Sequence, residues 1–337
     1  MIRFDTPATF AAALAFLPPP DGPSRAAAAA RQAILTKPPG SLGRLEEIAI
    51  FMAGWQARER PRLDSGRVVV FAGNHGVAAR GVSAYPPAVT AQMVANFASG
   101  GAAINALAAA AGLDLAVVPL DLDCPTADIT VAPAMTEAEC LHALNAGAGA
   151  VTPGLDLLVP GEMGIANSTA AAALCAAAFG GATRDWVGPG SGVVGSALAA
   201  KVAAVAAALS LHADACRSPF ETLRRLGGRE IAAIAGAVLA ARVARVPVLL
   251  DGFICAAAIA PLAAVQPAIV DHCLAGHCSA EPGHQRLLDR LGLVPLLNLD
   301  MRLGEASGAA VAAGIVRAAV AVHDGMATFA EAGVAAG

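Results

Sequence analysis

Arg67-Val68-Val69-Val70-Phe71-Ala72, followed directly by Gly73-Asn74-His75-Gly76, is the stretch that decides the fold. A short, near-continuous run of β-branched and apolar residues that ends in a glycine is typical of a strand buried on both faces. Similar runs follow at Leu115–Leu120, Leu155–Val159, Val246–Leu250, Ala268–Val270 and Val294–Leu299. Alanine-rich helical segments separate most of them. The sequence therefore predicts an α/β fold of Rossmann-like class, with a parallel sheet covered by helices on both faces.

The two ends of the chain have a helical pattern instead. Residues Ala26–Thr36 and Arg44–Arg60 carry apolar side chains at helical spacing, and the tail Ala309–Ala336 returns to helix. We therefore expect a large α/β domain, residues 61–305, that carries the active site. Residues 1–60 and 306–337 are expected to form a small helical domain.

Composition limits the possible environments of this 337-residue chain, which is 56% hydrophobic with a mean hydropathy of +0.61. Two long uncharged stretches, residues 81–113 and 252–270, are rich in Ala and Gly and interrupted by prolines. They lack the density of Leu, Ile and Phe found in spanning helices, so we expect buried helices and no membrane span. The N-terminus has no secretory signal pattern, which favours a cytoplasmic protein.

Charge and cysteine content narrow the class further. The net charge is −4, and no basic stripe is interleaved with aromatic residues, so we expect no nucleic-acid partner. The seven cysteines include no Cys-x-x-Cys pair, which favours reduced thiols. Cys273, His277, Cys278 and His284 form the most metal-like cluster, but their spacing matches no standard zinc module. We expect neither a metal nor a cofactor.

Polar side chains gather where the predicted strands end. Ligands of an open parallel sheet bind outside the carboxyl ends of its strands, although ordinary turn residues also occur there. The residues at these ends are Asn74, His75, Asp121, Asp123, Glu162, Asp251, Asp271, His272 and Glu305. Glu305 stands among small residues in Leu303-Gly304-Glu305-Ala306-Ser307-Gly308. It fits either a carboxylate over the mouth of the sheet or an acid that caps the following helix.

Three further segments suit parts of a nucleotide or a flat ring. Glycines in Gly188-Pro189-Gly190-Ser191-Gly192, before a predicted helix that carries Lys201, suit a phosphate, although a plain turn and a solvated lysine fit equally. Glu162 suits ribose hydroxyls, beside Asn167-Ser168-Thr169, which also suit a helix cap. The segment Gly81–Met93, with Ser83, Tyr85 and Gln92, suits an apolar heterocycle or a packed loop.

Together these segments resemble one family. The matching stretches are Lys37–Glu46, Asn74–Val77, Gly81–Pro86, Gly100–Asn105, Gly161–Asn167, Leu250–Phe253, Ser279–His284 and Leu303–Gly308. In this order they resemble nicotinate-nucleotide–dimethylbenzimidazole phosphoribosyltransferase of cobalamin lower-ligand assembly. Ala166 and Ala306 depart from the family pattern, which often has Gly at these positions.

The resemblance implies that 5,6-dimethylbenzimidazole displaces nicotinate from nicotinate mononucleotide, with inversion at the anomeric carbon. It also implies Glu305 as general base and a homodimer with the site near the interface. Site roles are implied as follows: ribose and nucleotide contacts at Glu162 and Gly164; the phosphate site at Gly190, Ser191, Gly192, Lys201 and Ser279; and the benzimidazole pocket at Ser83, Tyr85 and Gln92.

Three alternatives stay open at this point. The same fold and donor could serve another acceptor, such as adenine, a different benzimidazole or a phenol. The chain could instead be a non-catalytic nucleotide-binding subunit. A zinc protein built on the Cys273–His284 cluster is the third alternative.

Overall fold

Six parallel strands form one sheet in the computed structural model, which describes residues 2–335. The strands are β1 (Gly66–Ala72), β2 (Asp114–Pro119), β3 (Leu157–Met163), β4 (Val248–Leu250), β5 (Cys273–His277) and β6 (Pro295–Leu297). Their order across the sheet is β2-β1-β3-β4-β5-β6. The chain reverses direction across the sheet between β1 and β3, as in flavodoxin-like sheets, and such a switch point opens a crevice at the carboxyl ends of the strands.

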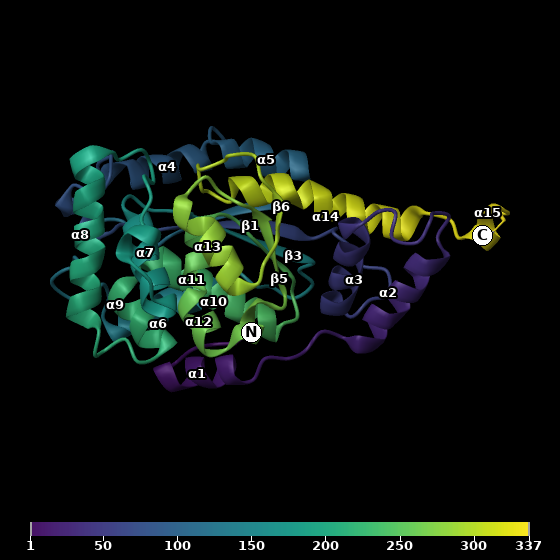
Figure 1. Ribbon diagram of the computed structural model, residues 1–337, viewed down its shortest axis with the longest axis horizontal. Coiled ribbons are helices and arrows are strands. Elements are labelled where there is room, and N and C mark those ends of the chain that lie inside the picture. Colours follow the sequence, from purple (N-terminus) through teal and green to yellow (C-terminus); the bar gives the residue numbers. More distant parts are fainter. Residues whose placement is uncertain (1, 336–337) are drawn as a thin grey trace.

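Helices cover both faces of this sheet, which confirms the predicted fold class (Figure 1). Successive strand residues alternate between the faces: Val69 and Phe71 pack with one group of helices, and Val68 and Val70 with the other. The first group includes α6 (Glu137–Gly149), α7 (Asn167–Phe179), α10 (Arg229–Val243) and α11 (Phe253–Ala258). The second includes α3 (Arg44–Gln56), α5 (Ala103–Ala111) and α14 (Ser307–Gly325).

The remaining elements are short or lie around this core. The helices are α1 (Pro7–Ala15), α2 (Gly22–Ile34), α4 (Ala88–Ala98), α8 (Gly195–His212), α9 (Pro219–Leu226), α12 (Ala260–Val265), α13 (Pro282–Leu291) and α15 (Phe329–Ala332). Three 3₁₀ turns span Gly76–Arg80, Thr183–Asp185 and Pro267–Val270.

Small residues explain the tight packing of α6 on α10. A Cβ atom added to Gly147 would lie 1.7 Å from the carbonyl oxygen of Ala233, and one added to Gly236 would lie 2.1 Å from that of Leu144. Only glycine fits at both positions, so the two backbones come into direct contact. Two glycines thus allow α6 and α10 to pack closely in a buried layer.

The predicted strand at Ala268–Val270 is wrong. Residues Pro267–Val270 form a 3₁₀ turn, and the fifth strand begins only at Cys273. Pro267 lacks an N–H group and has a fixed φ, which suits the first turn of a helix better than a central strand. As a result, Asp271 and His272 precede the strand and lie at the opposite edge of the sheet from the predicted site.

The chain ends meet along α14. Figure 1 shows α14 starting over the sheet and running outward to α2 and α3. Arg31 in α2 donates hydrogen bonds to the carbonyl oxygens of His323, Asp324 and Met326. By contrast, α1 also belongs to the predicted small domain but contacts a helix of the predicted large domain. Its Phe10 packs against Phe220 in α9, with ring centroids 6.2 Å apart. The division of the chain at residues 60 and 306 stays a prediction.

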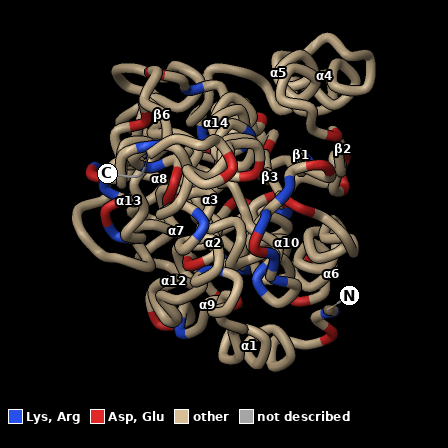
Figure 2. Tube along the Cα trace, turned by 90° about the vertical axis from the view of Figure 1, so that its right-hand side faces the viewer, with Lys and Arg blue, Asp and Glu red and all other residues tan. Residues whose placement is uncertain are grey.

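Two helical stretches expose apolar surface. Residues Ala88–Ala111, which include α4 and α5, and helix α8 are long and apolar enough to cross a membrane by length and composition alone. Only 22% and 28% of the most apolar 18 residues of these two stretches are buried. Figure 2 shows α4 and α5 without a charged residue along them. Exposed apolar patches of this kind are typical of surfaces that contact a partner.

Candidate active site

A cavity of about 140 Å³ opens at the carboxyl ends of β3 and β5 and beside the start of α11. Its walls come from segments far apart in the chain, which the sheet brings together. The lining residues are Val82 and Ser83, Glu162–Ser168, Pro189–Ser191, Gly252–Ile254, His277, Ser279, Glu281 and Arg302–Gly304.

The structure brings six of the predicted site residues to this cavity: Ser83, Glu162, Gly164, Gly190, Ser191 and Ser279. Glu305 and Gly192 each follow a lining residue directly in sequence. Lys201 is buried behind the 188–192 loop. Tyr85 and Gln92 are not brought to the cavity: both are exposed, Tyr85 by 53%.

Glu305 lies in the turn that joins β6 to α14, and it is only 5% exposed. Burial, together with the negative charge of Asp251, raises the pKa of Glu305 to about 7. The backbone of Glu305 and Ala306 is left-handed, with φ of 61° and 64°. Within residues 2–335, the structure shows no hydrogen bond to the Glu305 carboxylate. Its side chain therefore does not cap α14.

Glu162 lies near the end of β3, facing the residue before Glu305. A Cβ atom on Gly304 would lie 2.3 Å from Glu162 Oε1, so the absence of a side chain there allows the two segments to meet. Asn167 Nδ2 donates to Glu162 Oε2 at 2.5 Å. Burial, and the nearby carboxylates of Asp251, Glu230 and Glu305, raise the pKa of Glu162 well above its usual value despite the Asn167 hydrogen bond.

Lys201 fixes the glycine-rich loop from behind. Its Nζ donates to the carbonyl oxygen of Gly188 at 2.8 Å and to Ser168 Oγ at 2.9 Å, and the side chain is 1% exposed. The lysine is therefore not a solvated surface residue. Burial lowers the pKa of Lys201 to about 8, opposed by the charge of Glu281. Gly190 and Gly192 have φ of 55° and 118°, which glycine adopts most readily.

The comparisons with known proteins agree with this geometry. A family model described as phosphoribosyltransferase matches residues 17–334. The nicotinate-nucleotide–dimethylbenzimidazole phosphoribosyltransferase of Novosphingobium aromaticivorans is 66% identical over 337 residues, which is 100% of both chains. That of Cereibacter sphaeroides is 58% identical over 334 residues, 99% of each chain. The chain belongs to this phosphoribosyltransferase family.

A solved structure supports the same assignment. The crystal structure of nicotinate-nucleotide–dimethylbenzimidazole phosphoribosyltransferase from Thermus thermophilus superposes with a TM-score of 0.87 at 43% identity. The match covers 94% of this chain and 100% of that chain. The resemblance inferred from the sequence motifs is therefore confirmed at the level of the family.

The cysteine–histidine cluster has no geometry of a metal site. In the part of the chain that the structure describes, no three His, Cys, Asp or Glu side chains gather as metal ligands. His284 Nδ1 accepts a hydrogen bond from the Ser279 backbone N–H at 2.8 Å, and burial lowers the pKa of His284 to about 3. Burial raises the pKa of the Cys273 and Cys278 thiols, which disfavours the thiolate form that binds metals. The alternative of a zinc protein is not supported.

Near the cavity, sequence reasoning missed a buried hydrogen-bonded pair, His75 and Glu230. His75 Nε2 lies 2.5 Å from Glu230 Oε1, and both side chains are at most 2% exposed. Added Cβ atoms on Gly73 and Gly228 would meet this pair at 2.5 and 2.2 Å, so these glycines provide its space. The strand-end position of His75 was a usable signal. Nothing in the local sequence of Glu230, at the start of α10, points to a partner 155 residues away.

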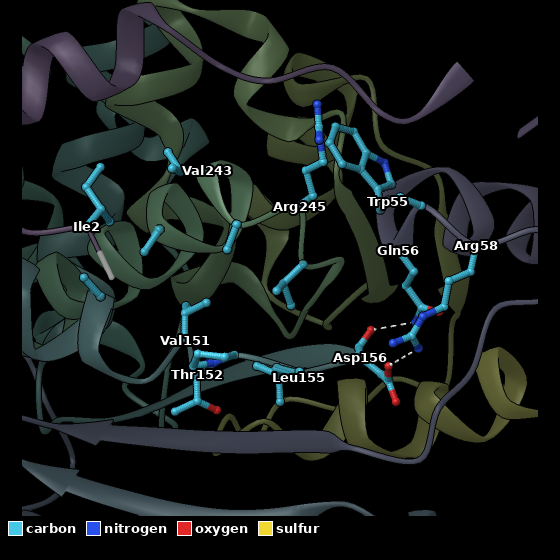
Figure 3. Close-up of a pocket in the computed structure, with 17 residues that line it drawn as sticks. Ile2, Trp55, Gln56, Arg58, Val151, Thr152, Leu155, Asp156, Val243 and Arg245 are labelled. Carbon is cyan, nitrogen blue, oxygen red and sulfur yellow. Dashed lines mark hydrogen bonds and ion pairs between the residues drawn. The ribbon is translucent and has the colours of Figure 1, made fainter. Parts of the chain in front are cut away.

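A larger cavity, of about 570 Å³, lies at the amino edge of the sheet (Figure 3). Apolar residues such as Ile2, Val151 and Val243 form much of its wall. Its one acid, Asp156, accepts a hydrogen bond from Arg58 at 3.1 Å and further bonds from backbone N–H groups. The acid is thus already satisfied, and the predicted site residues lie elsewhere. This cavity is a crevice between the ends of α3, α6 and α10 and the loop that leads into β3.

Proposed function

We propose that this chain moves the 5-phosphoribosyl group from nicotinate mononucleotide to 5,6-dimethylbenzimidazole. The products are α-ribazole 5′-phosphate and nicotinate. One observation carries the proposal: Glu305 is a buried carboxylate beside the cavity with a pKa raised to about 7, within a family of phosphoribosyltransferases. A general base works best when its pKa lies near the operating pH.

The chemistry explains why one base is sufficient. In the donor, nicotinate is bound to the anomeric carbon as a cationic pyridinium, so it leaves without being protonated. The acceptor ring carries an N–H proton, and Glu305 accepts this proton as the other ring nitrogen attacks the anomeric carbon. The C–N bond to nicotinate breaks as the new C–N bond forms on the opposite face. Displacement therefore inverts the carbon from β to α.

The donor fits along the lining of the cavity. We place the phosphate at the loop of Gly190, Ser191 and Gly192, where backbone N–H groups can approach an anion. Lys201 supplies positive charge from behind this loop. Ser279 Oγ is buried and has no hydrogen-bond partner within residues 2–335, so it is free to donate to the phosphate.

The ribose fits beside β3. We assign its contacts to Glu162 and Gly164, both of which line the cavity. Because its pKa is raised well above the usual range, Glu162 holds a proton more readily than an ordinary glutamate. Asn167 already donates to Glu162 Oε2, so a proton on Oε1 makes this group a donor to a ribose oxygen. Ionised, the same oxygen accepts from a ribose hydroxyl.

The acceptor pocket is the incomplete part of the site. Of Ser83, Tyr85 and Gln92, only Ser83 lines the cavity. Gln92 lies on α4, within the uncharged stretch that leaves most of its surface exposed. We propose a homodimer in which a second copy covers this stretch and completes the acceptor side. We also propose the small helical domain of residues 1–60 and 306–337 and a cytoplasmic location.

Mass detection of products tests the function directly. The purified chain should convert nicotinate mononucleotide and 5,6-dimethylbenzimidazole into nicotinate and α-ribazole 5′-phosphate. Adenine, other benzimidazoles and phenols belong in the same panel of acceptors. Turnover of one of these but not of dimethylbenzimidazole would replace the acceptor. Donor binding without turnover of any acceptor would contradict the enzymatic function.

A further inference from the structure

Asp251 follows β4 at the carboxyl edge of the sheet, and it is 1% exposed. Its Oδ1 accepts a hydrogen bond from the backbone N–H of Ala309, 58 residues away, at 2.9 Å. The same oxygen lies 3.4 Å from His277 Nε2 on β5. One buried carboxylate thus connects β4, β5 and the first turn of α14.

The turn before α14 needs such a connection. Glu305 and Ala306 both have left-handed backbone, which is strained for residues other than glycine. Ala306 is the N-cap residue of α14, and its side chain provides no capping hydrogen bond. The cap comes from Asp251 instead, through the N–H of Ala309 in the first turn. A strained turn persists only when its surroundings fix it.

We propose that Asp251 is a positioning residue that holds Glu305 in place for proton transfer. This inference rests on the proposed function, because it assigns Asp251 a part in that same reaction. Asp251 itself lies behind the cavity and does not line it. It acts through the helix start that it caps, and through its charge.

His277 holds the Asp251 carboxylate in this position. An added Cβ atom on Gly308 would lie 2.2 Å from the His277 ring, and one on Gly252 would lie 3.3 Å from Nε2. The ring is therefore fitted between the start of α14 and the end of β4. Both glycines leave the space that lets His277 approach Asp251. Three segments are held together around one carboxylate.

The charge of Asp251 acts on the groups that face it. These are Glu305 in the turn, Glu162 on β3, Cys255 on α11 and His277 on β5. After burial, the negative charge of Asp251 is what raises the pKa of Glu305. Removing that charge while keeping the hydrogen-bond acceptor should therefore make Glu305 easier to ionise. Removing the acceptor as well should release the turn.

Two substitutions separate these effects. Asp251→Asn keeps an acceptor oxygen for Ala309 and removes the charge. Its pH profile of kcat should shift so that activity persists to lower pH, by about half a unit or more, with KM for nicotinate mononucleotide within about twofold of wild type. Asp251→Ala removes both the acceptor oxygen and the charge. It should lower kcat at least about tenfold, while the donor still binds.

Asp156→Asn is the matched control, because Asp156 is also a buried aspartate that accepts backbone N–H groups, but at the opposite edge of the sheet. Its pH profile should coincide with that of wild type. Identical profiles for wild type and Asp251→Asn would overturn the inference, even if Asp251→Ala failed to fold. A profile shift in Asp156→Asn equal to that in Asp251→Asn would overturn it as well.

A second measurement does not depend on turnover. Carboxyl ¹³C NMR of the full chain, with Glu305→Gln to assign the signal, gives the pKa of Glu305 in wild type and in Asp251→Asn. A lower value in the variant supports the inference. An unchanged value overturns it. If wild type formed no α-ribazole phosphate but the NMR shift occurred, the proposed function would fail and the electrostatic link between Asp251 and Glu305 would stand.

Discussion

Replacing Glu305 by glutamine should remove most turnover while the fold remains. A positioned general base contributes about 10²–10⁴-fold to the rate, and glutamine cannot accept the ring proton, so kcat should fall by about that factor. In wild type, the pKa of about 7 means that log kcat should rise with pH at a slope near one below neutrality and level off above it. The variant should lose this dependence.

The same substitution should make the protein more stable at high pH. A carboxyl group with a raised pKa binds its proton more tightly in the folded chain, so its stabilising effect is fully present below the unfolded pKa of 4.5 and is lost as pH rises to about 7. Each unit of pKa corresponds to about 1.4 kcal/mol. After discounting for water in the cavity, we expect Glu305→Gln to exceed wild type by about 1–2 kcal/mol at pH 8 and by little at pH 5.

Three assays check these expectations. Mass detection of α-ribazole 5′-phosphate gives kcat from about pH 5 to about pH 9, a range that brackets the pKa of Glu305. Titration calorimetry gives the affinity for the donor. Urea unfolding at pH 5 and pH 8 gives the stability difference. Near wild-type turnover in Glu305→Gln would remove Glu305 as the base. Equal stability of wild type and Glu305→Gln at pH 8 would show that the ionised Glu305 carboxylate does not destabilise the folded chain.

Four further substitutions, one of them a control, test the contacts around the site. Lys201→Ala should raise KM for nicotinate mononucleotide about tenfold or more in steady-state assays, because the 188–192 loop loses its charged support; an unchanged KM would remove Lys201 from the phosphate site. Ala306→Gly should raise the free energy of unfolding in urea by about 1 kcal/mol, because glycine relieves the left-handed strain. The control Ala309→Gly, within α14, should lower that free energy by about as much. Changes of the opposite sign in the two variants would refute the strain argument. Gly304 has a φ of 86°, and an added Cβ atom would lie 2.3 Å from Glu162 Oε1. Gly304→Ala should therefore retain the fold, as measured by circular dichroism, but lower kcat about tenfold. A wild-type kcat in this variant would contradict the close contact.

The sequence predicted most of the fold because strands made of β-branched runs are visible without tertiary information. Strand β5, Cys273-Leu274-Ala275-Gly276-His277, has no β-branched residue, and it was missed. The reason is its contact with α14: a Cβ atom on Gly276 would lie 2.8 Å from the Cα atom of Ala309. Small residues are needed where the helix lies this close to the sheet. The packing that holds α14 in place thus removes the local signal of the strand beneath it.

The sequence led to a position for the candidate site but not to the connections between its residues. The rule that ligands bind at carboxyl strand ends led to Glu162, Asp251 and Glu305. What each of them contacts depends on partners far away in sequence, and no local pattern encodes these partners. The two departures from the family pattern have a physical meaning that only the backbone shows. Ala166 and Ala306 have φ of 74° and 64°, a region that glycine enters without strain.

The buried carboxylates around the cavity differ in whether each has a hydrogen-bond partner. Three of them have a polar partner: Asn167 for Glu162, His75 for Glu230, and the Ala309 N–H group with His277 for Asp251. Among the described residues, neither Glu305 nor Glu281, which also lines the cavity, accepts a hydrogen bond, and Glu281 differs in facing the positive charge of Lys201. A partner stabilises one protonation state and fixes the side chain, so the three partnered groups are suited to hold structure and charge. Burial, and after it repulsion from Asp251, raises the pKa of Glu305, and no hydrogen bond within the described part of the chain competes for its oxygens. Glu305 thus combines a raised pKa with oxygens that accept no hydrogen bond from the described residues, and these are the properties that the proposed general base requires.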